Sequence, residues 1–111
     1  MSRMQPTRDI SVTELAALRQ RGESPRLIDV REPWEFQRAS IADAELMPLG
    51  AIQEWVDTLD REQPYIIMCH HGSRSEMVCS FLRSRGFKQA INLDGGIDAW
   101  SLSVDPNVAR Y

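Results

Sequence analysis

The chain has 111 residues, of which 42% are apolar and 26% charged, with a formal net charge of −3 at pH 7. This length and composition suit one soluble globular domain, and the acidic balance excludes a general affinity for nucleic acid. No segment reaches the roughly 20 apolar residues of a membrane span, and residues 1–12 lack the apolar core of a secretory signal. We therefore expect a cytoplasmic protein with no membrane partner.

Strand-like and helix-like segments alternate along the chain. The expected strands are short apolar runs, and they lie at residues 9–10, 26–30, 45–49, 65–69 and 89–93. Each is followed by a segment that predicts a helix, and these segments lie at residues 11–22, 31–39, 51–60, 73–86 and 95–102. Pro33 suits a first helical turn, and Gly22 and Gly86 are typical of helix ends.

Two of these helices have an apolar side that the spacing of residues defines. In the segment 51–60 this side consists of Ile52, Val56 and Leu59. In the segment 73–86 it consists of Met77, Val78, Phe81 and Leu82. We expect these residues to face the core.

The alternation predicts an α/β fold with a central parallel sheet flanked by helices on both faces and joined by right-handed crossovers. In such sheets, functional sites lie beyond the carboxyl ends of the strands, where a strand runs into a helix. Three polar segments fall at such positions: DVRE at 29–32, CHHGSRS at 69–75 and DGG at 94–96. These segments are the candidates for a functional site.

Cys69 ends the most strand-like segment of the chain, YIIMC, and a helix follows it closely. The first N–H groups of that helix point back toward the loop, and they favour a negative charge such as a thiolate. A free cysteine titrates near pH 8.5, and a helix N-terminus or a cation lowers that value. Arg74 adds a permanent positive charge, and Gly72 lets the backbone adopt a positive φ. The pattern predicts a nucleophile within an anion-binding loop.

Two chemistries use a strand, a cysteine, a tight loop and an arginine: phosphotyrosine-type phosphatases and sulfurtransferases. Here Arg74 follows Cys69 by five positions, one fewer than in the phosphatase pattern. The phosphatase pattern also usually has histidine before the cysteine, whereas this chain has Met68. The smaller loop favours a single sulfur atom over a tetrahedral phosphate, so a small phosphatase or arsenate reductase is the disfavoured alternative.

Three motifs, LIDVREPWEF, CHHGSRS and INLDGGIDAW, resemble those of single-domain rhodaneses, the thiosulfate sulfurtransferase superfamily, in order and in approximate distance. The resemblance spans about residues 8–105. It implies a small α/β domain with a central parallel sheet. We therefore expect one rhodanese-like domain over residues 1–111, with an irregular C-terminal tail at 106–111.

The resemblance implies that Cys69 is the catalytic nucleophile, which takes a sulfane sulfur from thiosulfate or a similar donor as a persulfide. A thiophilic acceptor, cyanide or a cellular thiol, then removes that sulfur. The implied substrate-binding residues are those of the loop: His70, His71, Gly72, Ser73 and Arg74. The implied supporting residues are Asp29, Arg31, Ser75, Gly95 and Gly96. This chemistry needs no cofactor and no metal.

The sequence departs from the family pattern after Glu35. The family commonly has a glycine-histidine-isoleucine-proline-glycine-alanine run there, whereas this chain reads ASIADA, with Ser40 in place of the histidine and Asp43 in place of the second glycine. These positions shape a turn behind the site, so the transfer chemistry is unaffected. Stability and the choice of partner are the properties that they put in question.

Several residues have a simpler interpretation beside the functional one. Cys79 lies a full turn inside a helix, where a core role is favoured over that of a resolving thiol. Asp29 and Arg31 are expected to hold loops by hydrogen bonds and ion pairs rather than to touch the donor. Adjacent histidines rarely converge on one zinc ion. The second hypothesis for the whole protein is a sulfur carrier that a protein donor loads, with little activity on thiosulfate.

Overall fold

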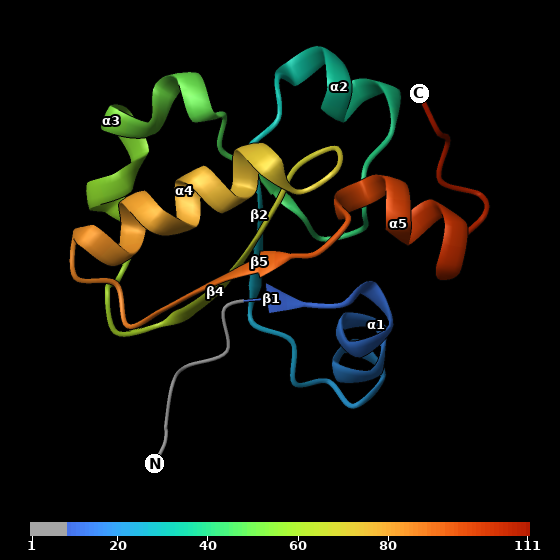
Figure 1. Ribbon diagram of the computed structural model, residues 1–111, viewed down its shortest axis with the longest axis horizontal. Helices are drawn as coiled ribbons and strands as arrows, with labels where there is room; N and C mark the ends of the chain where they lie inside the picture. Colours follow the sequence, from blue (N-terminus) through green and yellow to red (C-terminus); the bar gives the residue numbers. More distant parts are fainter. Residues whose placement is uncertain (1–8) are drawn as a thin grey trace.

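The computed structural model describes residues 9–111, so the predicted start of the core, at about residue 8, lies just outside the described residues. Five parallel strands form one sheet in the order β1-β5-β4-β2-β3 (Figure 1). The strands are β1 (Asp9–Ile10), β2 (Arg26–Asp29), β3 (Glu45–Leu46), β4 (Pro64–Met68) and β5 (Gln89–Leu93). The predicted parallel sheet is confirmed.

Helices cover both faces of this sheet, as the alternation of elements predicts. They are α1 (Val12–Gln20), α2 (Pro33–Arg38), α3 (Ile52–Trp55), α4 (Ser73–Ser84) and α5 (Gly96–Ser103). On one face, α3 and α4 pack against residues such as Ile28 and Ile67. On the other face, α1 and α5 pack against the strand residues next to these in sequence, such as Leu27 and Ile66. Side chains alternate across a strand, and this alternation divides the core into two layers.

The segment 45–60 is less regular than the sequence predicts. Strand β3 stops at Leu46, whereas a strand over 45–49 was expected. The N–H of Met47 still donates to the Asp29 carbonyl, but the N–H of Leu49 then donates to the Val30 carbonyl, one residue on instead of two, so the regular parallel ladder ends. The expected helix over 51–60 is a single α-helical turn, α3, between the 3-10 turns η1 (Leu49–Ala51) and η2 (Val56–Thr58). The Thr58 hydroxyl donates to the Trp55 carbonyl at 2.6 Å, which competes with a helical hydrogen bond at that group.

The buried face of α4 also differs from the expected one. Val78 and Leu82 are buried, but Met77 is 61% exposed. The residues of α4 that are buried share a spacing of three and four positions, and they are Ser75, Val78, Cys79 and Leu82. Ser75 therefore faces inward beneath the cysteine loop, at the position where the helix meets the site.

None of the helices within residues 9–111 is long and apolar enough to cross a membrane. Residues 105–111 continue from the end of α5 in turns and irregular backbone and bring Tyr111 back toward α2. The tail therefore reaches the carboxyl end of the sheet, where the three polar segments of the sequence also lie.

Candidate active site

The cysteine loop connects β4 to α4 at the carboxyl end of the sheet (Figure 1). Cys69 is the residue directly after β4 and is only 1% exposed. Gly72 has a φ of 114°, a value that side-chain-bearing residues rarely adopt, and this reverses the chain just before α4 begins. The loop therefore wraps around the sulfur before the helix starts.

Hydrogen-bond donors surround the sulfur of Cys69. The Gly72 N–H donates to Sγ at 3.0 Å, and the Ser75 hydroxyl lies 3.4 Å from Sγ. Burial raises the pKa of the thiol, but hydrogen bonds from the Ser75 hydroxyl and from the N–H groups of Ser75, Gly72 and Arg74 lower it, and the net pKa lies below the ordinary value. The loop can therefore stabilise an anion on this sulfur.

Arg74 is held by Glu35 of α2. Its two terminal nitrogens donate to the two carboxylate oxygens at 2.7 and 2.9 Å, and the Glu35 side chain is only 4% exposed. The hydrogen bonds from Arg74 lower the pKa of Glu35 to about 2. Because a bidentate pair of this kind engages both terminal nitrogens, Arg74 offers less charge to a donor than the sequence implied.

His70 and His71 follow Cys69 and differ in exposure. The ring of His70 stacks on that of His71 at 4.0 Å and on that of Tyr111 at 4.0 Å, and its Nε2 is buried without a hydrogen-bond partner. Burial lowers the pKa of His70. The side chain of His71 is 66% exposed and its Nε2 lies 3.8 Å from an Asp98 oxygen. Only His71 therefore fully matches the exposed rim that the sequence predicts.

One group of side chains among residues 9–111 has the composition of a metal site: His70, His71 and Asp98, whose candidate ligand atoms lie within 4.8 Å of one another. Asp98 already accepts a hydrogen bond from Arg110 at 2.9 Å. The two imidazole planes are inclined by only 27°, so their in-plane lone pairs run nearly side by side instead of converging on one ion. The absence of a metal stays a prediction.

Asp29 and Arg31 form a fully buried ion pair at 2.6 Å. Arg31 also donates to the Ala39 carbonyl at 2.7 Å and to the Tyr111 hydroxyl at 2.8 Å. Its guanidinium therefore ties the end of β2 to the chain after α2 and to the tail. This geometry supports the interpretation that the pair holds loops in place.

Gly95 and Gly96 bring the start of α5 against the cysteine loop. The N–H of Ile97 donates to the Cys69 carbonyl at 3.0 Å, and the N–H of Asp98 donates to the His70 carbonyl at 3.1 Å. A Cβ on Gly96 would overlap both of these carbonyl groups. The two glycines therefore support the loop from behind.

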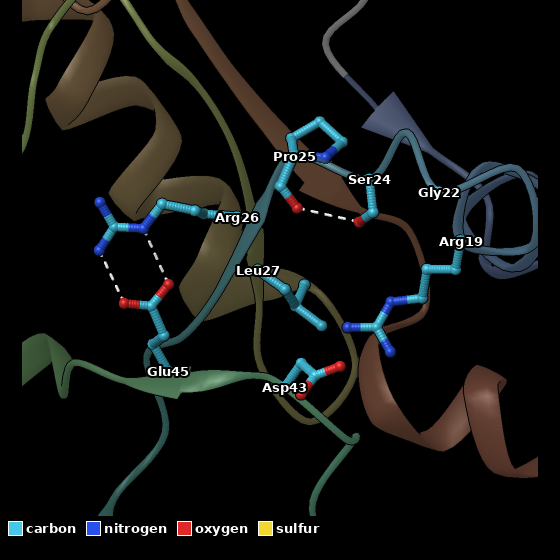
Figure 2. Close-up of a pocket in the computed structure, with 8 residues that line it drawn as sticks. All are labelled: Arg19, Gly22, Ser24, Pro25, Arg26, Leu27, Asp43 and Glu45. Carbon is cyan, nitrogen blue, oxygen red and sulfur yellow. Dashed lines mark hydrogen bonds and ion pairs between the residues drawn. The ribbon is translucent and has the colours of Figure 1, made fainter.

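Two hollows lie at opposite ends of the sheet. The first, of about 450 Å³, opens beside Arg74, and its lining is mostly apolar: Val30, Glu32, Pro33, Pro48, Leu49, Gly50 and Ala51. The second, of about 420 Å³, lies at the amino end of β2, where the Arg26 guanidinium donates two hydrogen bonds to the Glu45 carboxylate (Figure 2). Asp43, one of the two departures from the family pattern, lines this second hollow with a φ of 69°, so the expectation that it shapes a turn behind the site is wrong. This departure is therefore remote from Cys69.

Ser73 begins α4, and its side chain is exposed. Asn92 and Tyr111 are not predicted from the sequence to belong to the site, and neither is the contact between Glu35 and Arg74. Asn92 accepts a hydrogen bond from Ser75, and Tyr111 donates one to Glu35. No pattern local to the chain links these partners, which are 17 and 76 positions apart.

The fold and the cysteine loop define a class of domain, and comparison with known proteins gives the family. Residues 11–103 match the rhodanese-like domain family, so the chain belongs to that family. The crystal structure of a rhodanese-like domain protein from Staphylococcus aureus superposes with a TM-score of 0.81 at 27% identity, covering 95% of this chain and 99% of that one.

Three curated relatives are similar to the chain. It is 37% identical to the putative sulfurtransferase YtwF of Bacillus subtilis, over 88% of this chain and 97% of that protein. It is 32% identical to the thiosulfate sulfurtransferase GlpE of Tolumonas auensis, over 82% of this chain and 85% of that protein. It is also 37% identical, over its whole length, to the Rhodanese-like/PpiC domain-containing protein 12, chloroplastic, of Arabidopsis thaliana, but it spans only 40% of that protein.

Proposed function

We propose that this protein is a sulfurtransferase that carries a sulfane sulfur as a persulfide on Cys69. The observation that carries this proposal is the environment of Sγ, where the Gly72 N–H at 3.0 Å and the Ser75 hydroxyl at 3.4 Å surround a buried thiol of lowered pKa. The names of two relatives, a putative sulfurtransferase and a thiosulfate sulfurtransferase, support it.

The transfer has two steps. The Cys69 thiolate attacks the outer sulfur of thiosulfate, a new S–S bond forms, and the bond to the inner sulfur breaks so that sulfite leaves with the electron pair. An acceptor thiolate or cyanide then attacks the outer sulfur of the persulfide, and Cys69 leaves as a thiolate. The loop N–H groups stabilise the anion in both steps, as an oxyanion hole stabilises developing charge.

One observation favours the alternative of a sulfur carrier that a protein donor loads. Both terminal nitrogens of Arg74 are engaged by Glu35, at 2.7 and 2.9 Å, so little of the positive charge of Arg74 is available to a free dianion such as thiosulfate. Under this alternative, Cys69 forms the same persulfide but receives the sulfur from another protein. A cysteine desulfurase is a donor of the right chemistry. The two proposals therefore differ in what loads Cys69 and not in the intermediate.

The proposal is tested by the intact mass of the reduced protein after incubation with thiosulfate and then with cyanide. We expect the wild type to gain one sulfur, about 32 Da, and to lose it to cyanide. Cys69→Ser should gain nothing, whereas the control Cys79→Ala should behave as the wild type, because Cys79 is buried and its pKa is raised to about 12.

The outcome separates the two proposals. A protein that stays unloaded with thiosulfate but gains a sulfur on Cys69 from a cysteine desulfurase with cysteine is a carrier. Sulfur gained equally by the Cys69→Ser variant, or by neither protein from either donor, contradicts the persulfide. Hydrolysis of an aryl phosphate that depends on Cys69 would instead revive the phosphatase alternative.

A further inference from the structure

The hydroxyl of Ser75 lies among three acceptors but has one proton. Its Oγ is 2.5 Å from Oδ1 of Asn92, 3.1 Å from the Gly72 carbonyl oxygen and 3.4 Å from the Cys69 sulfur. Ser75 is fully buried, so water does not satisfy these groups. A hydroxyl donates one strong hydrogen bond at a time. The three acceptors therefore compete for the same proton.

The distances decide the competition in favour of Asn92. Oδ1 is an amide oxygen and can only accept, so Ser75 must be the donor in this pair. The Asn92 oxygen is the nearest of the three acceptors, at 2.5 Å, the short limit of an O–H···O bond, whereas the sulfur at 3.4 Å receives the weaker share of the proton. Asn92 is fixed in place, because it lies in β5, pairs with strands on both sides and is only 5% exposed.

We propose that Asn92 is a positioning residue of the site: its side-chain oxygen holds the Ser75 hydroxyl proton and so limits the hydrogen bonding that the Cys69 thiolate receives. The inference rests on Cys69 being the nucleophile of the proposed function. The proton stays on Ser75 throughout, and only the direction of the O–H bond is set. Asn92 touches neither sulfur nor substrate and acts through Ser75.

This restraint matches the demands of sulfur transfer. Cys69 must attack a donor, and the nucleophilicity of a thiolate falls as its pKa falls, so the most reactive thiol has a pKa near the ambient pH. The pKa of Cys69 is already lowered, first by the Ser75 hydroxyl at 3.4 Å and then by loop N–H groups such as that of Gly72. A shorter hydrogen bond from a Ser75 hydroxyl freed from Asn92 would lower the pKa further and would reduce the intrinsic nucleophilicity of the thiolate. Asn92 prevents that loss.

Other ionisable groups also face the sulfur. Arg74, at the start of α4, interacts electrostatically with Cys69, and its guanidinium forms an ion pair with Glu35 of α2. Cys79, further along α4, interacts electrostatically with Cys69, and His70 directly follows Cys69 in the loop. None of these groups changes when residue 92 is substituted, so they set a constant background.

The test is the pH dependence of Cys69 alkylation by iodoacetamide, followed by mass spectrometry of the peptide. Asn92→Asp offers a stronger acceptor to Ser75 and adds a negative charge, so we expect the midpoint to rise by about one pH unit. Asn92→Leu has a similar shape and no acceptor. We expect its midpoint to fall and its plateau rate at high pH to fall with it, because the freed Ser75 proton stabilises the thiolate.

A second substitution shows whether Asn92 acts through Ser75. In a Ser75→Ala background, Asn92→Leu should leave the midpoint unchanged, because no hydroxyl remains to be redirected. Asn107→Asp makes the same chemical change as Asn92→Asp at an exposed position in the tail, and it controls for added charge. Ser80→Ala is the exposed control for Ser75→Ala on the same helix.

The outcomes are distinguishable from a loss of structure and from failure of the proposed function. If Asn92 only packs, both variants loosen the loop and their midpoints rise together or do not move, which overturns the inference. If Asn92→Asp does not fold, as judged by circular dichroism, the sign of the Asn92→Leu shift with and without Ser75 decides alone. Alkylation needs no sulfur donor, so absence of the persulfide cycle would leave this result standing.

Discussion

The thiol of Cys69 is subject to two opposing effects at the scale of single residues. Burial disfavours a charge on sulfur, and hydrogen bonds from the loop favour it; the lowered pKa means that the hydrogen bonds prevail. The charge of Arg74 contributes less than the sequence suggests because Glu35 neutralises it. Hydrogen bonds from the Ser75 hydroxyl and from the loop N–H groups, rather than a free cation, therefore lower the pKa of this thiol.

The carboxylate of Glu35 should make stability depend on pH at the acidic end. Its pKa is lowered from 4.5 to about 2 in the folded protein, chiefly by hydrogen bonds from Arg74. The stabilisation is fully present above pH 4.5 and is lost as the pH falls through about 2. We expect Glu35→Gln to cost roughly 2 kcal/mol at pH 7 and to flatten the dependence of unfolding free energy on pH in this window.

Urea unfolding at a series of pH values measures this effect. The exposed Glu54 provides the matched control, because Glu54→Gln removes the same charge from the surface. Retention of the full acid dependence by Glu35→Gln would show that other groups titrate in this window. An equal change in Glu54→Gln would assign the effect to net charge instead of to the pair with Arg74.

The core of the site could be predicted from sequence because its chemistry is local. Cys69, Gly72 and Arg74 lie within six consecutive residues, and the strand-loop-helix pattern fixes their relation. The partners of these residues come from other elements, and periodicity carries no information about contacts between distant segments. The contacts of Asn92 and Tyr111 with the site are therefore seen only in the folded structure.

The contact between α5 and the cysteine loop determines the site at the scale of elements. The N–H groups of Ile97 and Asp98 bind the carbonyls of Cys69 and His70, and this close approach leaves no room for a side chain on Gly96. Backbone contacts of this kind cannot relax by a change of rotamer. The start of α5 therefore sets the shape of the loop from behind.

Gly96→Ala should be severely destabilising for this reason. The added Cβ overlaps two backbone carbonyls, at a residue whose φ of 59° is already unfavourable for alanine. We expect a loss of more than about 3 kcal/mol in urea unfolding, together with altered Cys69 alkylation. Normal stability of this variant would show that α5 can move away from the loop.

Two other glycines separate the causes. Gly22 has a φ of 71° with nothing within 4 Å, so Gly22→Ala should cost only the backbone strain, about 1–2 kcal/mol. Gly50 has neither a positive φ nor a close neighbour, so Gly50→Ala should leave stability nearly unchanged or raise it by up to about 1 kcal/mol. Equal losses in Gly96→Ala and Gly22→Ala would exclude the steric contribution.

The central elements were predictable from sequence, whereas the segment 45–60 was not. Strand β4 is apolar on both faces because helices cover both, β5 is apolar apart from Gln89 and Asn92, and such runs are recognisable in sequence. The segment 45–60 also carries an apolar pattern, but hydrogen bonds that the pattern does not encode, such as that from the Thr58 hydroxyl to the Trp55 carbonyl, interrupt its helix. Those local competitors, rather than the hydrophobic pattern, decide where η1, α3 and η2 begin and end.

At the scale of the whole molecule, the C-terminal tail contacts residues beside the site through Tyr111. The Tyr111 hydroxyl donates to Glu35 at 2.7 Å and accepts from Arg31 at 2.8 Å, and its ring stacks on His70 at 4.0 Å with an angle of 5°. The two hydrogen bonds join residues that are 76 and 80 positions apart in sequence. With the ring contact, they connect Tyr111 to α2, to the segment after β2 and to the cysteine loop. Tyr111 holds the partner of Arg74 in place from outside the loop.

Tyr111→Phe should therefore weaken both stability and sulfur loading. The variant keeps the ring but removes the hydroxyl, which leaves Glu35 without one donor and Arg31 without one acceptor, at a cost of about 1–2 kcal/mol. Tyr65→Phe is the matched control, because its hydroxyl bonds the backbone of Asp60 near the start of β4, at the opposite end of that strand from Cys69. We expect both variants to lose stability in urea, but only Tyr111→Phe to change the rate at which Cys69 gains sulfur. Equal loading rates in the two variants would mean that the tail stabilises the fold without positioning Glu35 and Arg74.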